Sequence, residues 1–464
     1  MSLVVRTESA ELSDLLAWAV DTAAGHVIRG GTTGPLDVDE HHPGGRGTAV
    51  YAPCYRAGYS HRSGYYLRDF CHQAVGAHLA GLRTENAGML ASFVASTVDG
   101  WPAWALNFDG TTPLAIDVKP DGRRVRELPA VFELVETIHA VHRWTGRPVD
   151  AEAAAFAKRT VTDFVAAHDR ERRNGIAEAG GASIFDGVAS YDESPELRMF
   201  EAGDGIASQY AATRHAAALT AAAGGDPRHL AAQAHRIHRH YREEWSRDGG
   251  DTVVSGWTRE GVAAVGWHRE ATWFPPMKGL LAGDPRQAAE LARIDGLALA
   301  PGTAPQNLEA LTYLPDVFLR AGDVERAFAW MLRIFSRRDE PHIVPQQGVN
   351  GTYPEVAFTL LAQGVAGLLG LEPDAGAGRL TLAPNLARAV STLEADGIPF
   401  GDGDVDVAVD ASTVRVHNGT SRPLEVRLAR RRRGVHRDPH LAVAEPGETV
   451  EPGRSLRLTR VHRP

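Results

Sequence analysis

Residues 67–82 of this chain read LRDFCHQAVGAHLAGL. Their apolar side chains recur at spacings of three and four, which places them on one face of an α-helix. The stretches 128–138 and 153–165 repeat this pattern. Between these two lies Thr145-Gly146-Arg147-Pro148, a sequence typical of one helix ending and the next beginning. The chain is therefore predicted to contain paired amphipathic helices.

The same periodicity predicts about twelve helices before residue 371. Their approximate ranges are 9–28, 66–82, 84–97, 127–145, 151–168, 205–223, 227–246, 268–281, 285–294, 305–321, 323–336 and 354–369. Very short connections inside several pairs indicate antiparallel neighbours. Longer stretches rich in glycine and aromatic residues separate the pairs, at 29–65, 98–126, 169–204, 247–267 and 337–353. We therefore expect a mainly α fold, an (α/α)6 six-hairpin toroid over residues 1–371, with the long loops at one mouth.

The pattern changes after Leu371, where apolar residues begin to alternate with polar ones. Val405, Val407 and Val409 show this period of two, and glycine-containing turns follow them. Such a pattern predicts a small antiparallel, sandwich-like β domain over residues 372–464. The basic run Arg430–Arg433 lies beside a predicted strand, where a charged edge or turn is a simpler interpretation than nucleic-acid binding.

Composition restricts the class of protein. The 464 residues are 43% hydrophobic and 23% charged, a balance that allows a large core. A net charge of -9 argues against a nucleic-acid partner, and two cysteines, Cys54 and Cys71, favour a reducing compartment. We find neither a secretory signal at the start nor an apolar run long enough to span a membrane. We therefore expect a soluble, cytoplasmic protein, with its oligomeric state open.

The first candidate motif is Tyr65-Tyr66-Leu67-Arg68-Asp69, where a long loop meets a helix. Arg68 and Asp69 lie off the apolar stripe. A guanidinium and a carboxylate together supply donors and acceptors for adjacent sugar hydroxyls. The competing interpretation is an acidic residue placed to interact with the helix dipole.

The second motif, Met199-Phe200-Glu201-Ala202-Gly203-Asp204-Gly205, also leads into a helix. An aromatic neighbour such as Phe200 would desolvate Glu201 and raise its pKa, as a general acid requires. Asp204 is a candidate for substrate binding, although a helix N-cap is its simpler role.

The third motif, Asn350-Gly351-Thr352-Tyr353-Pro354-Glu355, opens the last long helix. The N-terminus of a helix favours the ionised form of Glu355, which a general base needs. Asp339 and Glu340 remain alternatives for the base.

The aromatic set Trp101, Trp104, Trp257, Trp267, Trp273 and Tyr353 would suit stacking on sugar rings, with core packing as the competing interpretation. The 20 histidines form no metal-binding pattern, and His235, His238 and His240 are interpreted as a solvated helix face. No nucleotide-binding glycine motif is present. We therefore expect neither a metal nor another cofactor.

Together the three motifs resemble those of the six-hairpin glycosidases, and among them the glucoamylase-like hydrolases. Tyr66-Leu67-Arg68-Asp69 is similar to their aromatic–x–Arg–Asp motif, which holds the terminal sugar. Phe200-Glu201 is similar to their aromatic–Glu motif, in which Glu is the general acid. Glu355 lies where these families place the general base. The chain departs from the pattern at Ala202, where a second Glu is usual, and in lacking a Glu-Gln-Tyr sequence around the base.

The resemblance implies an inverting glycoside hydrolase that acts on a terminal sugar, with Glu201 as acid and Glu355 as base about 6.5–9.5 Å apart across one mouth. The implied substrate-binding residues are Tyr66, Arg68, Asp69, Trp104, Phe200, Asp204, Trp257, Trp267 and Tyr353. Two alternatives stay open. One is a sugar epimerase or polysaccharide lyase on the same barrel, with His268 and His342 as proton carriers. The other is a non-catalytic carbohydrate-binding scaffold.

Overall fold

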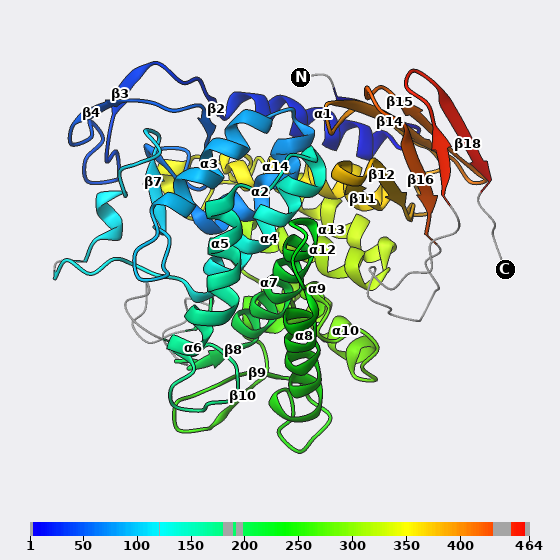
Figure 1. The fold of residues 1–464 in the computed structure, drawn as a ribbon. Helices are drawn as coiled ribbons and strands as arrows, with labels where there is room; N and C mark the ends of the chain where they lie inside the picture. The colour runs from blue at the N-terminus through cyan, green and yellow to red at the C-terminus, as the bar shows by residue number, and fades with distance from the viewer. Residues whose placement is uncertain (1–2, 120, 180–188, 192–197, 430–446, 460–464) are drawn as a thin grey trace.

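The computed structural model describes residues 3–119, 121–179, 189–191, 198–429 and 447–459 (Figure 1). Arg430–Arg433 lies outside these residues. No helix in the described part of the chain is both long and apolar enough to cross a membrane.

Every predicted helical stretch contains a helix. The bounds are α1 (Ala10–Gly25), α2 (Leu67–Leu79), α3 (Arg83–Ala95), α4 (Leu128–Thr145), α5 (Ala151–Arg159), α6 (Val165–His168), α7 (Gly203–Ala222), α8 (Arg228–His240), α9 (Arg269–Lys278), α10 (Gln287–Leu299), α11 (Leu308–Leu311), α12 (Tyr313–Ala321), α13 (Val324–Ser336) and α14 (Pro354–Ala362). A π-helical turn joins α5 to α6, and another, Gln363–Gly367, extends α14. The prediction of a mainly helical chain is confirmed.

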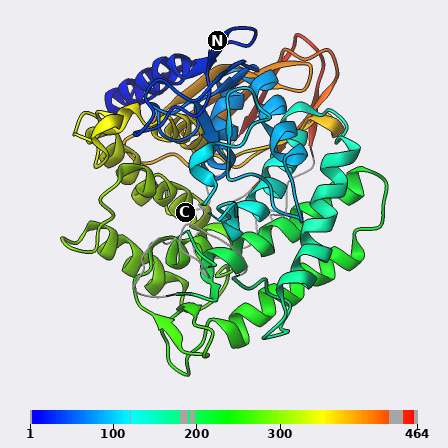
Figure 2. The same ribbon diagram turned by 90° about the vertical axis from the view of Figure 1, so that its left-hand side faces the viewer.

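The helices form two layers. α2, α4, α7, α9 and α12 contact one another in that order, α12 contacts the extension of α14, and α14 packs on α2. The remaining long helices alternate with these along the chain and pack around them, as α1 does on α14, α8 on α7 and α13 on α12. Seen from the side in Figure 2, the ribbon colours pass around the view in chain order. Each inner helix except α12 follows a long connection, and contacts between the first turns of α2, α9, α12 and α14 place the starts of these four helices at the same end of the molecule.

Glycines allow two of the inner crossings to be very close. A Cβ on Gly76 of α2 would lie 1.9 Å from the Phe358 carbonyl oxygen of α14. A Cβ on Gly203 of α7 would lie 2.0 Å from the Ala271 carbonyl oxygen of α9. Neither distance is possible for a real side chain, so only glycine permits these helices to pack as they do.

The C-terminal region forms two sheets. The first has the order β1 (Val4–Thr7), β13 (Leu393–Phe400), β14 (Gly403–Val409), β15 (Thr413–Asn418) and β18 (Ser455–Thr459), with every pair antiparallel. The second has the order β11 (Leu371–Asp374), β12 (Arg379–Leu382), β16 (Leu424–Leu428) and β17 (Glu448–Val450). Val405, Val407 and Val409 are buried, as the alternation predicted.

Two features of this region differ from the prediction. β12 and β16 pair in parallel, so the prediction of a purely antiparallel β domain is wrong for this pair. The reason is that β13, β14 and β15 intervene and return the chain in the same direction, as a crossover does. In addition, β1 from the start of the chain pairs with β13, with Val4 opposite Asp396.

Short strands hold the loops at the end where the inner helices begin. They are β2 (Val27–Ile28) with β5 (Cys54–Tyr55), β3 (Thr33–Pro35) with β4 (Thr48–Val50), β6 (Gly64–Tyr66) with β7 (Ala105–Asn107), and β8 (Glu201–Ala202) with β9 (Val254–Trp257) and β10 (Ala263–Val265). β6 leads directly into α2, and β8 leads directly into α7. These strands therefore fix the two loops that carry the first and second candidate motifs.

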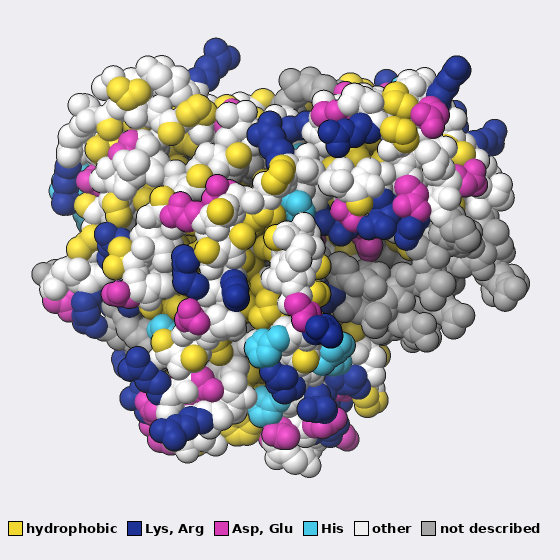
Figure 3. Space-filling model, in the orientation of Figure 1, with side chains coloured by type: hydrophobic (Ala, Val, Ile, Leu, Met, Phe, Trp, Pro, Cys, Tyr) yellow, Lys and Arg dark blue, Asp and Glu magenta, His cyan; other side chains and the backbone are white. Residues whose placement is uncertain are grey.

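The outer helix α8 presents a polar face to solvent. Figure 3 shows His and Arg side chains gathered over this helix, in the lower centre of the view. His235 is exposed, whereas Leu230, Ala234 and Ile237 on the opposite face are buried. This distribution is that of an amphipathic helix covering the core.

Candidate functional site

Side chains from the first turns of several inner helices meet at the end where these helices begin. Arg68 of α2 donates from Nη2 to Glu270 Oε1 of α9 at 3.1 Å and from Nε to the Tyr313 hydroxyl of α12 at 3.2 Å. Its guanidinium also lies 4.5 Å from the centre of the Tyr191 ring. Arg68 therefore links three separate parts of the chain at one point.

Asp69, the next residue of α2, is buried beside α14. The Tyr353 hydroxyl donates to Asp69 Oδ1 at 2.7 Å. Burial and the negative charge of Glu355 raise the pKa of Asp69 to about 7, against the opposing effects of Tyr353 and Arg68. A substantial fraction of Asp69 is therefore protonated near neutral pH, as a proton donor requires.

Glu355 of α14 is bound by a histidine that the sequence analysis did not identify. His72 Nδ1 lies 2.6 Å from Glu355 Oε1, and His72 Nε2 lies 3.2 Å from Asp316 Oδ2 on α12. The imidazole stacks on the Tyr313 ring at 3.9 Å between centroids. Burial lowers the pKa of His72, but hydrogen bonds to Asp316 and Glu355, and their charges, raise it to about 9.

Tyr353 is held on its other side by His342. The two rings stack at 5.9 Å with an interplanar angle of 11°. His342 Nε2 lies 3.2 Å from Glu309 Oε2 of α11. Burial lowers the pKa of His342, while the hydrogen bond to Glu309 and its charge raise it overall. His268, the other histidine considered for proton transfer, directly precedes α9.

We name Arg68, Asp69, Glu270, Glu309 and Glu355 the mouth cluster. Solvent reaches this part of the molecule, because the neighbouring side chains of His72 and Asp316 are 12% and 35% exposed although both lie on inner helices. Among the described residues, no group of three or more His, Cys, Asp or Glu side chains is arranged to hold a metal ion.

Glu201 lies on β8 with different partners. Its Oε2 accepts from Trp245 Nε1 at 2.6 Å, and its Oε1 accepts from Asn174 Nδ2 at 2.9 Å, with Arg172 Nε at 3.6 Å. Burial raises the pKa of Glu201, opposed by Trp245, Arg172 and Asn174. The raised pKa has the direction that a general acid needs. In the described part of the chain, however, no hydrogen bond or ion pair joins these partners to Glu355.

Asp204 holds the segment that contains Ser190 and Tyr191 by accepting hydrogen bonds from it. Its Oδ2 accepts from Ser190 Oγ at 2.9 Å and from the Tyr191 amide at 2.6 Å, and the carboxylate is fully buried. Because Tyr191 lies against Arg68, Asp204 supports the mouth cluster from behind.

Tyr66 directly precedes α2, which carries Arg68 and Asp69, and the predicted tryptophans have their indole N–H groups engaged. Tyr66 packs edge-on against Trp104 at 5.2 Å, and Trp104 Nε1 donates to Glu127 at 2.8 Å. Trp257 Nε1 donates to the Trp245 carbonyl, and Trp267 Nε1 donates to the Thr303 carbonyl, both at 2.9 Å.

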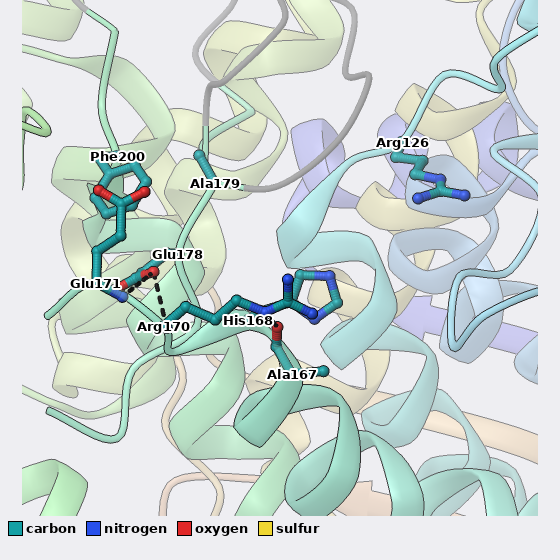
Figure 4. A pocket seen from close by; sticks show the side chains of 8 residues that line it. All are labelled: Arg126, Ala167, His168, Arg170, Glu171, Glu178, Ala179 and Phe200. Atoms are coloured by element: carbon teal, nitrogen blue, oxygen red, sulfur yellow. Dashed lines mark hydrogen bonds between the residues drawn. The ribbon is translucent and has the colours of Figure 1, made fainter. Parts of the chain in front are cut away.

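Phe200 contributes to a separate cavity of about 230 Å³ (Figure 4). Arg259 lies 4.7 Å above its ring. The cavity is also lined by Arg126, Ala167, His168, Arg170, Glu171, Glu178 and Ala179. It shares no lining residue with the mouth cluster, and the Glu178 carboxylate in it accepts backbone amides of its own loop.

Sequence reasoning missed His72, Glu270, Glu309 and Asp316. His72 follows Asp69 by three residues and Arg68 by four, a spacing that places all three on one helix face. Glu270 and Asp316 lie in the first turns of α9 and α12, as Glu355 does in α14. The argument used for Glu355, an acidic residue in the first turn of a helix at the loop end, would therefore also have identified Glu270 and Asp316.

No protein-family model matches this chain, and no curated protein matches its sequence. Solved structures do match. The chain is similar to an α-L-rhamnosidase of Streptomyces avermitilis, solved with L-rhamnose, with 14% identity and a TM-score of 0.61 over 98% of this chain and 42% of that one. It is also similar to a GH78-family rhamnosidase of Bacillus sp. GL1, with 14% identity and a TM-score of 0.60 over 92% and 43%.

A putative kojibiose phosphorylase from the human microbiome matches with 9% identity and a TM-score of 0.54, over 100% of this chain and 68% of that one. This chain spans about two fifths of the length of the two rhamnosidases. At such identities the likeness concerns the fold. The chain has the helical-barrel fold of these solved structures, as the helix pattern of its sequence predicted.

Proposed function

We propose that the chain is a glycoside hydrolase that releases a terminal sugar with inversion, at the mouth of a closed (α/α)6 toroid formed by residues up to 371. The observation that carries this proposal is the mouth cluster, in which carboxylates from the first turns of α2, α9 and α14 interact with Arg68, and Glu309 of α11 interacts with Asp69. Inverting hydrolysis needs one protonated and one ionised carboxyl group on opposite sides of the scissile bond. The substrate is a carbohydrate or glycoside, and residues 372–464 support the barrel.

Glu355 is the proposed general base, because it lies in the first turn of a helix and faces the His72 imidazole. Asp69 is the proposed general acid. Its pKa of about 7, raised by burial and by the negative charge of Glu355, suits proton donation. Glu201, the acid predicted from the sequence, is the alternative, although both of its oxygens already accept hydrogen bonds.

Arg68 and Glu270 are the proposed ligands of the sugar hydroxyls. A paired guanidinium and carboxylate can each exchange their mutual hydrogen bond for one to a hydroxyl. Tyr66 and Trp104 are the proposed stacking surface beside them. We place the activity in the cytoplasm because both cysteines are free thiols.

The histidines beside the cluster favour a second candidate function, a sugar epimerase. His72 and His342 both adjoin residues of the proposed acid–base pair, and histidine is a common carrier of protons to and from carbon. Incubating sugars with the enzyme in heavy water separates the two functions. Carbon-bound deuterium in the product would indicate an epimerase, whereas a hydrolase introduces none.

The decisive experiment is turnover of a panel of aryl glycosides with good and poor leaving groups. Glu355→Gln should lower kcat by about 10³-fold for every leaving group, because each turnover needs the activated water. Asp69→Asn should spare good leaving groups and stop poor ones. The matched control is Asp226→Asn, in the exposed turn between α7 and α8, which should leave kcat unchanged.

A leaving-group dependence in Glu201→Gln rather than in Asp69→Asn would move the acid to Glu201. If Glu355→Gln retains wild-type kcat on every substrate, the proposed base is wrong. Binding of glycosides without any turnover by the wild-type protein would favour a carbohydrate-binding scaffold instead.

A further inference from the structure

His72 lies between two carboxylates on two other helices. Its Nδ1 faces Glu355 on α14 at 2.6 Å, and its Nε2 faces Asp316 on α12 at 3.2 Å. A neutral imidazole carries one N–H and can donate to only one of them. Since carboxylates are acceptors, satisfying both contacts requires the doubly protonated, cationic ring. The geometry alone therefore indicates a positive charge on His72.

Asp316, the carboxylate that faces His72 Nε2, is itself held by a hydrogen bond from Gln363. Gln363 Nε2 donates to Asp316 Oδ2 at 2.8 Å and to the Thr312 carbonyl at 2.7 Å. The His72 ring lies nearly parallel to the Tyr313 ring, at an angle of 6°. Stacking fixes the plane of the imidazole, and the two carboxylates fix its rotation in that plane. His72 is consequently held in one orientation.

We propose that Asp316, His72 and Glu355 form a positioning device, the His72 bridge, that acts on the proposed general base. The imidazolium holds Glu355 Oε1, stabilises the ionised carboxylate and leaves Oε2 to accept a proton from water. Asp316 keeps the imidazolium charged and in place. His72 touches no substrate in this scheme. The inference rests on the proposed role of Glu355.

The bridge should depend on pH in a defined way. The pKa of His72 is raised to about 9, so the cation is present below that pH and is lost above it. The titratable and charged groups around His72 are Glu355 on α14, Asp316 and Tyr313 on α12, and Arg68 and Asp69 on α2. Because Asp69 loses its proton near pH 7, it sets the alkaline limb of the rate. The bridge is therefore read from the acidic limb.

Two substitutions separate the two ends of the bridge. His72→Asn places an amide N–H near the position of Nδ1 and keeps a donor to Glu355. His72→Gln places the amide near Nε2 and keeps contact with Asp316 only. We expect His72→Gln to lower kcat about 10- to 100-fold with KM changed less than about twofold, because a hydrogen bond to a charged group is lost. His72→Asn should retain several-fold more kcat.

Both variants should change the acidic limb of the pH profile of kcat, because the positive charge beside the proposed base is lost. The matched control is His142→Asn on the exposed part of α4, which should leave kcat and its pH profile unchanged. Equal kcat values for His72→Asn, His72→Gln and wild type would overturn the positioning role.

Nitrogen-15 NMR of the histidine rings tests the bridge without any substrate. His72 should be an imidazolium at pH 7 and titrate near pH 9, whereas His78, whose pKa burial lowers to about 4, should be neutral at pH 7. In Glu355→Gln the titration of His72 should move down by at least about one unit, because an opposite charge is lost.

A neutral His72 at pH 7, or a titration unaffected by Glu355→Gln, would overturn the proposal. If no glycoside is hydrolysed and His72 still titrates as expected, the proposed function fails and the bridge stands as an electrostatic device.

Discussion

Replacing Asp69 by Asn should make the protein more stable at neutral and alkaline pH while removing activity on substrates with poor leaving groups. Asp69 is only 7% exposed and lies beside the negative charge of Glu355. An amide has nearly the same shape, its oxygen still accepts from the Tyr353 hydroxyl, and it carries no charge. The substitution therefore removes an unfavourable ionisation and keeps the packing.

The magnitude follows from the pKa of Asp69, which is raised from 3.8 to about 7. The folded protein binds this proton more tightly than the unfolded chain, so stability falls as pH rises between these two values. The penalty is absent below about pH 4 and complete above about pH 7, where it reaches at most about 4 kcal/mol. With an unfolding entropy of about 2 cal/mol/K per residue, relief of this penalty raises Tm by up to about 4 °C.

The assay is calorimetric melting of wild type and Asp69→Asn at pH 4, 6 and 8. The Tm difference should be near zero at pH 4 and grow in favour of the variant up to pH 8. Asp226→Asn is the control, since Asp226 is exposed and bonded to Arg228, and it should melt at or slightly below wild type throughout. An Asp69→Asn variant that melts below wild type at pH 8, or differs by the same amount at every pH, would refute the reasoning.

Two further substitutions test the packing of the inner helices. Lys278→Met should lower the free energy of unfolding by about 3–5 kcal/mol in chemical denaturation, because the largely enclosed Lys278 side chain, 13% exposed, pairs with two glutamates of α4 at 2.8 and 2.9 Å. The control Lys158→Met, at an exposed position of α5, should stay within about 0.5 kcal/mol of wild type. Gly76→Ala should lower the free energy of unfolding by at least about 1–3 kcal/mol, since the added Cβ would collide with the Phe358 carbonyl oxygen. Gly88→Ala should leave stability unchanged or raise it, because the atom nearest to its added Cβ lies 3.6 Å away. Equal melting of the two alanine variants would contradict the close approach of α2 and α14.

The helices could be predicted because their signal is local. An apolar stripe at spacings of three and four is complete within one helix, so α2 and α4 are found to within three residues of their observed ends. The pairing of β1 with β13 could not be found this way. Four residues, Val4–Thr7, carry too little alternation to signal a strand, and the partner lies at the other end of the chain.

The two predicted catalytic residues show what sequence position can and cannot fix. Both were assigned because they precede or open a helix at the loop end of the barrel. For Glu355 the helix itself fixes the direction of the side chain. Glu201 lies instead on the two-residue strand β8, where successive side chains point to opposite faces. Which face Glu201 takes is decided by donors distant in sequence, Trp245 and Asn174, and no periodicity of its own segment reveals them.

The mouth cluster is a consequence of topology as much as of its residues. Each inner helix follows a returning outer helix, so the first turns of α2, α9, α12 and α14 meet at one end, and an acidic residue favoured there by the helix dipole is brought next to the others. Asp69 and Tyr353 are 284 positions apart and share a hydrogen bond for this reason. Burial and the accumulated negative charge then raise the pKa of Asp69, against the opposing effect of nearby cations. Arg68 and His72 are those cations. The proposed acid and the proposed base therefore belong to one arrangement, and Asp69 and Glu355 should show strongly non-additive effects in a double-mutant cycle.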